Sequence, residues 1–451
     1  MSAPVTVTLV HLGCARNLID SELILARMAE EGCRVAGDLE GADVAVLNTC
    51  SFIGPARKES EEAIDSLLER KRRGALRAVV VAGCLVQRFQ HDLEERFPEV
   101  DLFAEISDYR ELARSVRELG AGARVPRYLA ASGLREPGGE GARLLATPGS
   151  YAYLRISHGC DHACTFCAIP SIRGPHRSKS VAVLEEEARE LIDAGVRELV
   201  LVAEDSTAWG RDLGLELPHL VEALADLPGD HRLRVMYAYP NRFPWALTAL
   251  LRDHERVLPY LDIPVQHAAT PVLRAMGRAG SGDQVRRTLD RLREEVPGIT
   301  LRTTLLVGFP GETDADVEEL VSFVRTYGLG RMGVFAYSNE EGTPAFELGG
   351  AVSETDAAER VAAVLAERDR VITASQEARV DEEIEVLVDE VHTAGEGARR
   401  LVGRTDRDAP EVDPLVVVSG ERASGVQVGE RIQVRVHGAA GAEDGFALFA
   451  E

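Results

Sequence analysis

Residues 151–170 read YAYLRISHGCDHACTFCAIP, a strand-like run followed directly by a cysteine-rich loop. The three cysteines of the loop, Cys160, Cys164 and Cys167, are spaced C-x3-C-x2-C. Because the loop is short, their thiols must lie close together. Thiolates that converge in this way hold either a zinc ion or an iron–sulfur cluster. The stretch therefore predicts a metal centre at the end of a strand.

Zinc is the simpler alternative, because His158, His162 or His176 could supply the fourth ligand of a tetrahedral site. Two observations count against it. Structural zinc sites usually pair their cysteines as two C-x2-C units. The loop also follows the first strand of a barrel-like series, and the carboxyl ends of barrel strands normally host reactions. A catalytic metal centre is therefore favoured.

The cysteine loop opens a series of six alternating strand and helix patterns. The strands read YAYLRIS, VRELVLVAED, RLRVMYAYP, LPYLDIPVQH, ITLRTTLLVGFPGE and RMGVFAYS. Such alternation predicts a parallel sheet covered by helices. Since a complete (β/α) barrel needs eight units, we expect a partial (β/α)6 barrel over residues 146–380.

Both ends of the chain have a different organisation. Three strand–helix units, with strands VTVTLVHLGC, ADVAVLNTC and LRAVVVAGC, predict a parallel α/β sheet domain over residues 1–125. Residues 121–150 are rich in Gly and Pro and predict a linker. Five short strand patterns in residues 381–451 predict a small β-barrel of the kind that serves as a binding module.

Charge limits the class of partner. The 451 residues include 51 Lys and Arg against 74 Asp and Glu, a net charge of -23. Residues 381–451 alone have seven Arg and no Lys against sixteen acidic residues, a net charge of -9. This composition is poor for binding nucleic-acid phosphates and suits a basic protein, so we expect no DNA partner. With no long apolar run and no basic signal-peptide start, we expect a cytoplasmic protein that does not enter membranes.

A second set of cysteines follows the three N-terminal strands. Cys14, Cys50 and Cys84 each stand at the end of a strand and before a helix. Because parallel strands end at one edge of a sheet, we expect these three thiols to converge. Cys33 follows a helix instead, and we expect it to be a structural core residue.

The C-x3-C-x2-C loop resembles that of the radical S-adenosylmethionine superfamily, in which an aromatic residue often precedes the third cysteine, as Phe166 does here. The resemblance implies a 4Fe-4S cluster on Cys160, Cys164 and Cys167, with its fourth iron left for S-adenosylmethionine. Glu204, Gln266 and Gly308 end other strands of the series and are candidates to contact the cofactor. The alternative for each is a capped strand end or a hydrogen-bonded core residue.

Over nearly its whole length the chain resembles the methylthiotransferase family. The motifs are GCARNLIDSE, NTCSFI, AGCLVQR and GCDHACTFCAIPSIRG, with a C-terminal β-module similar to a TRAM domain. The resemblance implies a second 4Fe-4S cluster on Cys14, Cys50 and Cys84 that handles the sulfur to be inserted. It also implies that S-adenosylmethionine is both radical source and methyl donor, and that an electron donor and a sulfur donor take part. It assigns no catalytic residue beyond the cluster ligands.

One branch of that family modifies a ribosomal-protein aspartate and another modifies an adenosine of transfer RNA. NTCSFIGPARKES, YLDIPVQHAATPVLRAMGR and GRTDRDAPEVD resemble the ribosomal-protein branch. The expected reaction is therefore methylthio insertion at the β-carbon of an aspartate in the twelfth small-subunit protein. The alternatives are a transfer-RNA methylthiotransferase and a noncatalytic metal-stabilised adaptor. One departure is His158, which stands before Gly159 where the family more often has an acidic residue.

Overall fold

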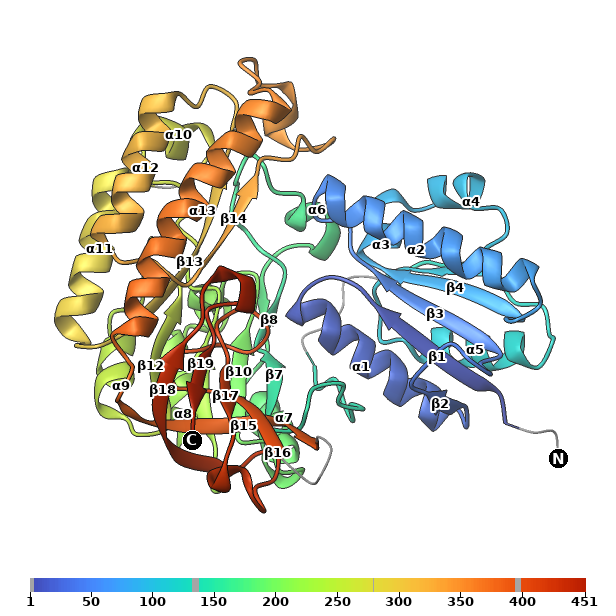
Figure 1. Ribbon diagram of the computed structural model, residues 1–451. Coiled ribbons are helices and arrows are strands. Elements are labelled where there is room, and N and C mark those ends of the chain that lie inside the picture. The colour runs from blue at the N-terminus through green and yellow to red at the C-terminus, as the bar shows by residue number, and fades with distance from the viewer. Residues whose placement is uncertain (1–3, 132–137, 279, 394–398) are drawn as a thin grey trace.

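The computed structural model describes residues 4–131, 138–278, 280–393 and 399–451, so part of the expected linker, residues 132–137, lies outside the described residues. An N-terminal sheet domain, a half-barrel and a closed C-terminal barrel follow one another along the chain, and Figure 1 shows the N-terminal domain beside the half-barrel. No described helix is both long enough and apolar enough to cross a lipid bilayer.

The N-terminal sheet is parallel, with strand order β2-β1-β3-β4-β5-β6. Its strands are β1 (Thr6–His11), β2 (Arg34–Ala36), β3 (Val44–Thr49), β4 (Ala78–Gly83), β5 (Leu102–Ala104) and β6 (Tyr128–Leu129). The three predicted strands, β1, β3 and β4, are confirmed. The sequence missed β2, β5 and β6, because strands of two or three residues carry almost no periodic signal.

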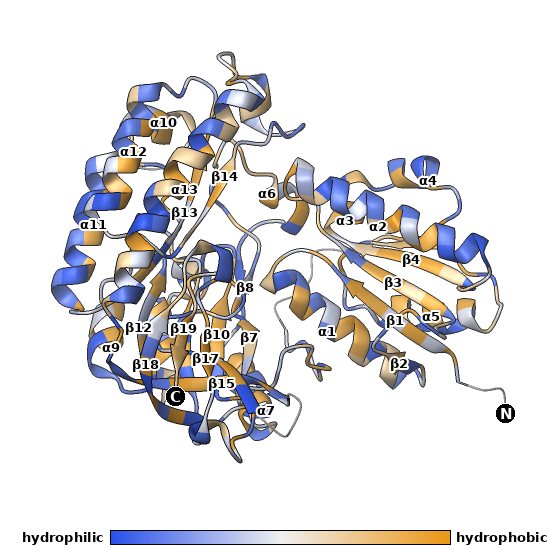
Figure 2. Ribbon diagram, viewed as in Figure 1, coloured by the Kyte–Doolittle hydropathy of each residue, from blue (hydrophilic) through white to orange (hydrophobic). Residues whose placement is uncertain are grey.

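Helices cover both faces of this sheet. They are α1 (Ala15–Glu30), α2 (Gly54–Arg72), α3 (Cys84–Phe89), α4 (Asp92–Arg96) and α5 (Arg110–Gly120). Alternate residues of β3 pack against opposite layers: Val44 and Val46 lie with α1 and α5, whereas Ala45 and Leu47 lie with α2 and α3. Since β3 and β4 are buried on both faces, they are mostly apolar, as Figure 2 shows, and the polar residues Asn48 and Thr49 stand only at the end of β3.

The middle domain is the expected half-barrel, a parallel sheet of order β14-β13-β12-β11-β10-β7. Its strands are β7 (Tyr151–Arg155), β10 (Glu198–Val202), β11 (Arg232–Val235), β12 (Val257–Asp262), β13 (Thr300–Val307) and β14 (Met332–Ala336). The covering helices are α7 (Val181–Asp193), α8 (Leu217–Ala225), α9 (Leu247–Asp253), α11 (Gly282–Glu295), α12 (Asp314–Thr326) and α13 (Glu354–Glu377). The smaller elements are β8 (Ser157–His158), β9 (Arg177–Ser178), α6 (Ile169–Arg173) and α10 (Thr270–Ala275). Because β7 and β14 do not pair, the barrel stays open on one side, as the count of six units predicts.

The predicted C-terminal β-barrel is confirmed as a closed barrel of order β15-β16-β17-β19-β18. Its strands are β15 (Glu383–Thr393), β16 (Arg399–Arg404), β17 (Val416–Val418), β18 (Arg431–Ala439) and β19 (Leu448–Ala450). Most inward residues, such as Val386, Leu401 and Val436, are fully buried. The barrel therefore has a core of its own.

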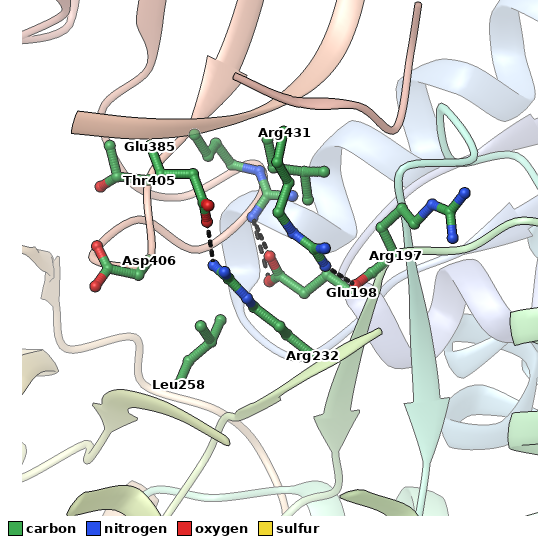
Figure 3. A pocket seen from close by; sticks show the side chains of 10 residues that line it. Arg197, Glu198, Arg232, Leu258, Glu385, Thr405, Asp406 and Arg431 are labelled. Carbon is green, nitrogen blue, oxygen red and sulfur yellow. Dashed lines mark hydrogen bonds and ion pairs between the residues drawn. The ribbon is translucent and has the colours of Figure 1, made fainter. Parts of the chain in front are cut away.

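The C-terminal barrel docks on the half-barrel at the amino ends of the parallel strands. Figure 3 shows Arg232 of β11 pointing toward Glu385 of β15, with their nearest atoms 2.6 Å apart. Residues 405–413, here called the plug loop, extend from β16 into the half-barrel, where Ala409 is fully buried in the core that β7, β10 and β12 share with the N-terminal domain. Side chains of the half-barrel bind this loop: Arg234 to Asp406 O, Arg331 to Asp408, Tyr151 to Glu411, and Tyr260 and Arg302 to Asp413.

Candidate functional site

The C-x3-C-x2-C loop lies at the open carboxyl end of the half-barrel, between β8 and α6. Cys160, Cys164 and Cys167 line a cavity of about 200 Å³, together with Phe166 and Glu204. Gln266 lines the same cavity. The structure thus brings the three cysteines together with three of the four residues expected to contact a cofactor.

Two glycines let the backbone around the loop approach closely. Gly159 has φ +72°, and a Cβ there would lie 2.1 Å from Pro175 O. Gly277, with φ +65°, lies against the loop itself, because a Cβ there would be 2.6 Å from Ala163 O. Backbone hydrogen bonds then hold the loop, from Cys160 N to Gly174 O at 3.1 Å and from Thr165 N to Met276 O at 2.9 Å. Only glycine fits these two positions without displacing the loop.

Burial makes two thiols of this loop weaker acids than a free cysteine. It raises the pKa of Cys160 to about 12 and that of Cys167 to about 11, and the neighbouring cysteines add to both shifts. Three half-buried thiolates side by side would repel one another. A metal that replaces the thiol protons removes this repulsion, so metal binding here releases protons.

The three histidines proposed as zinc ligands have other partners. His162 Nε2 lies 2.6 Å from Asp205 Oδ2, and His176 Nε2 lies 3.1 Å from Ser178 Oγ. His158 Nε2 lies 3.6 Å from a Glu140 oxygen. Within the described ranges, no three His, Cys, Asp or Glu side chains are grouped to hold a single metal ion.

Glu204 is a buried carboxylate in the lining of the Cys160 cavity. Its side chain is 5% exposed, and its nearest cation is Arg16, with Nε 3.9 Å from Oε1. Among the described residues, the buried Oε2 atom has no hydrogen-bond partner. An orphaned carboxylate oxygen beside three thiols fits the amino group of S-adenosylmethionine, because a buried acceptor is costly unless a donor reaches it.

Gln266 and Gly308 differ in their placement. Gln266 has φ +72°, an uncommon conformation for this residue, and backbone hydrogen bonds with Thr304 and Leu306 hold it beside the cavity. Gly308 lies outside the cavity lining: its N–H donates to the Glu312 carboxylate, and a Cβ there would lie 2.9 Å from Ala357 Cβ on α13. Its positive φ is thus explained by a turn and by helix packing, and a cofactor contact at Gly308 stays a prediction.

The second set of cysteines converges as expected at the carboxyl edge of the N-terminal sheet. Cys14 precedes α1, Cys50 follows β3 and Cys84 begins α3. A Cβ on Gly13 would lie only 3.3 Å from Cys50 Sγ, and Ser51 Oγ donates to Cys84 O at 2.9 Å, so the three turns touch. Cys33 lies apart in the apolar core and is 8% exposed, which agrees with its predicted structural role.

The thiols of this second set differ in acidity. Burial raises the pKa of Cys50 to about 11. Burial also raises the pKa of Cys84, although Arg173 offsets part of the shift. Desolvation acts in the same direction at Cys14, but Arg16 and Arg173 outweigh it and lower the pKa of Cys14 below its usual value. Cys14 is therefore the thiol of this set that loses its proton most readily.

Sequence reasoning missed these two arginines. Arg16 extends from the N-terminal domain into the cavity of the Cys160 loop, where Nη1 donates to Ala203 O at 2.7 Å. Arg173 extends the other way, from α6 to Cys84, with Nη2 3.3 Å from Sγ. Their partners are distant along the chain, so no local pattern could have revealed the contacts. The nearby motifs GCARN and SIRG contain the two residues without showing what they touch.

Three family descriptions match successive parts of the chain. Residues 6–105 match the Uncharacterized protein family UPF0004, residues 154–324 match the Radical SAM superfamily, and residues 380–444 match the TRAM domain. The chain is also 40% identical to the ribosomal protein uS12 methylthiotransferase RimO of Geotalea uraniireducens, over 95% of each chain. It is 41% identical to the RimO protein of Trichlorobacter lovleyi, again over 95% of each.

The chain belongs to the RimO family. Solved structures of other proteins share the fold of this chain. The RimO-family chain superposes on the radical S-adenosylmethionine methyltransferase TsrM from Kitasatospora setae with a TM-score of 0.54 and 16% identity, covering 76% of this chain and 77% of that one. It superposes on the cobalamin-dependent radical enzyme OxsB with a TM-score of 0.53 and 15% identity, covering 82% of this chain and 56% of that one. At such low identity the likeness concerns the fold alone.

Proposed function

We propose that the chain is a ribosomal protein uS12 methylthiotransferase, which inserts a methylthio group at the β-carbon of an aspartate by radical chemistry. One observation carries the proposal. In a member of the RimO family, two sets of three cysteines face the boundary between the N-terminal domain and the half-barrel: Arg16, two residues after Cys14, lines the cavity of the Cys160 loop, and Arg173 reaches Cys84. Two three-cysteine sites supply the two activities that sulfur insertion needs, at one place.

Cys160, Cys164 and Cys167 would hold a 4Fe-4S cluster whose fourth iron is left for S-adenosylmethionine. When bound, this pair supplies a radical able to take hydrogen from an unactivated C–H bond. Glu204 Oε2 would accept a hydrogen bond from the cofactor's amino group, while Gln266 and the ring of Phe166 would line its pocket. Tyr239 stacks on His162 with ring centroids 3.8 Å apart, and the pair forms part of the cavity wall.

Cys14, Cys50 and Cys84 would hold the second 4Fe-4S cluster, which carries the sulfur to be inserted. All three come from turns at one edge of the N-terminal sheet, and Arg173 of α6 reaches Cys84 there. An electron donor and a sulfur donor must reach the two sites. All seven cysteines are free, which suits a reducing compartment, and we propose that the protein works in the cytoplasm.

The acceptor would be a basic ribosomal protein of the small subunit. The family name supports this choice, and so does the acidity of residues 381–451, with a net charge of -9. Opposite charge speeds the encounter of two proteins and helps to orient it. An RNA acceptor would instead gain from Lys and Arg that neutralise phosphates, and this segment contains no Lys.

The test uses the full chain, reconstituted anaerobically with iron and sulfide. Recombinant uS12 and unmodified transfer RNA are offered separately with S-adenosylmethionine and dithionite, and mass spectrometry measures the gain on each. We expect methylthiolation of one uS12 aspartate. Cys33→Ala is the matched control and retains activity, because Cys33 lies in the core away from both sites. Modification of transfer RNA alone would refute the proposal, and zinc bound without sulfide would favour the noncatalytic adaptor.

A further inference from the structure

Arg173 connects the two cysteine sites. It is the last residue of α6, the short helix that begins two residues after Cys167. Its side chain is only 6% exposed and enters the N-terminal domain. There Nη2 lies 3.3 Å from Cys84 Sγ and Nη1 lies 2.7 Å from Asp20 Oδ2. Figure 1 shows α6 between the half-barrel and α3, the helix that begins at Cys84. One end of α6 thus adjoins the first site and the other end contacts the second.

Asp20 fixes the direction of the Arg173 guanidinium. Asp20 is fully buried on α1, and its other oxygen accepts from Arg155 Nη1 at 2.9 Å. Nη2 of Arg173 also lies 3.4 Å from Asn17 Oδ1, on the same face of α1. A guanidinium held by a buried carboxylate has little freedom to turn, so Asp20 and Asn17 of α1 set the direction of its hydrogen bond to Cys84 Sγ.

Arg16 makes the reciprocal crossing from the second site to the first. It stands two residues after Cys14, and its guanidinium carbon lies 4.7 Å from the centroid of the Tyr237 ring in the cavity of the Cys160 loop. Each cysteine site therefore receives an arginine from beside the cysteines of the other. The contact of Arg173 ends at the Cys84 sulfur, which a link that only joins the two domains would not require.

We propose that Arg173 is a positioning residue of the second site, where it donates a hydrogen bond to the Cys84 sulfur and raises the reduction potential of a cluster bound to Cys14, Cys50 and Cys84. The inference rests on the proposed function, which assigns a cluster to these cysteines. Reduction adds negative charge to a cluster, and a cationic donor at a ligand sulfur stabilises that charge. Because Arg173 belongs to the helix that follows the Cys160 loop, the first site also determines where this donor stands.

Arg88 provides a matched control. It is 7% exposed and also joins the N-terminal domain to the half-barrel, with Nη1 2.9 Å from Glu340 Oε2 and 2.7 Å from Ser51 O. It stands on α3, four residues after Cys84, but its guanidinium bonds to oxygens. Arg88→Met therefore tests the loss of a buried link between the domains at the same helix without removing the donor to Cys84.

The experiment isolates the second cluster. The parent is the full chain with Cys160, Cys164 and Cys167 all replaced by Ala, reconstituted anaerobically. Iron and sulfide are assayed, and the midpoint potential is measured by a redox titration followed by electron paramagnetic resonance. We expect a more negative midpoint in Arg173→Met than in the parent, partial recovery in Arg173→Lys, and no shift in Arg88→Met.

The outcomes separate a failure of the inference from a failure of the proposed function. A parent that binds no cluster would overturn the two-cluster assignment, and with it the inference. A cluster-loaded Arg173→Met protein with the parent's potential would overturn the inference alone. An equal shift in Arg88→Met would do the same, since it would trace the effect to the domain boundary. If Arg173→Met loses its iron, Arg173→Gln, which is polar but uncharged, takes its place under the same criterion.

Discussion

Arg404 on β16 donates from Nη1 to both carboxylate oxygens of Glu198 on β10, at 3.2 and 3.1 Å. Both side chains are almost fully buried, and Arg404 also pairs with Asp389. Removing one partner leaves buried charge uncompensated. We therefore expect Arg404→Met to lower the free energy of unfolding by roughly 3–5 kcal/mol, measured by urea denaturation. Arg435→Met on β18 is the control: its side chain is 61% exposed and 3.8 Å from Asp381, so a change of about 1 kcal/mol or less is expected. Equal losses in both variants would contradict the buried pairing.

Acid should weaken the ion pair between Asp408 and Arg331, which holds the plug loop in the half-barrel. Burial would raise the pKa of Asp408, but Arg331 and Thr405 hold it below its usual value. Because the folded pKa is the lower one, the carboxylate stabilises the fold above about pH 4, and this stabilisation is lost as the pH falls through the folded pKa. We expect Asp408→Asn to be less stable than the parent at pH 7 and the difference to shrink below about pH 4. Urea denaturation at several pH values measures it, and a difference independent of pH would refute the assignment.

Gly159→Ala should prevent the Cys160 loop from forming, because the new Cβ would meet the backbone at Pro175 O. Gly149→Ala is a matched control: Gly149 also has positive φ, +90°, but a Cβ there has no neighbour within 4 Å. We expect Gly149→Ala to cost about 1–2 kcal/mol of stability and to bind a full complement of iron. Gly159→Ala should bind markedly less. Iron assays after reconstitution measure this, and equal iron content would show that the loop tolerates the Cβ.

Glu204→Gln should weaken the binding of S-adenosylmethionine. The exchange keeps the shape of the side chain but removes the charge that faces the cavity. A hydrogen bond to a charged group contributes about 1.5–3 kcal/mol, so an affinity loss of roughly 10- to 100-fold is expected by calorimetry. The exposed Glu222 of α8 offers the control Glu222→Gln, which should bind as the parent does. Unchanged affinity in Glu204→Gln would show that Glu204 does not contact the cofactor.

The two cysteine sets should divide the reaction. Cys164→Ala removes a ligand of the Cys160 loop and should abolish reductive cleavage of S-adenosylmethionine, followed as 5'-deoxyadenosine by chromatography. Cys50→Ala disturbs the N-terminal set alone and should retain cleavage while losing methylthiolation of uS12. The expectation follows from the positions of the thiols, since Cys164 lines the cavity and Cys50 does not. The same loss of cleavage in both variants would contradict the assignment of cleavage to the Cys160 loop alone.

Much of the fold was predictable because its signals are local. The six strands of the half-barrel, the five of the C-terminal barrel and the two cysteine sets all follow from spacing along the chain. The convergence of Cys14, Cys50 and Cys84 needed only the rule that parallel strands end at one edge. The short strands β2, β5 and β6 escaped prediction, because two or three residues show no period.

The sequence by itself determined which cysteines stand at the ends of which strands. Only the tertiary structure decided that Arg173 reaches Cys84 and that Arg16 reaches the Cys160 cavity. It also decided that the plug loop enters the half-barrel at the amino ends of the strands. The reason is physical. Strands and loops follow from neighbouring residues, whereas an ion pair between residues more than a hundred positions apart exists only after whole domains have packed, and it depends on how their apolar surfaces fit.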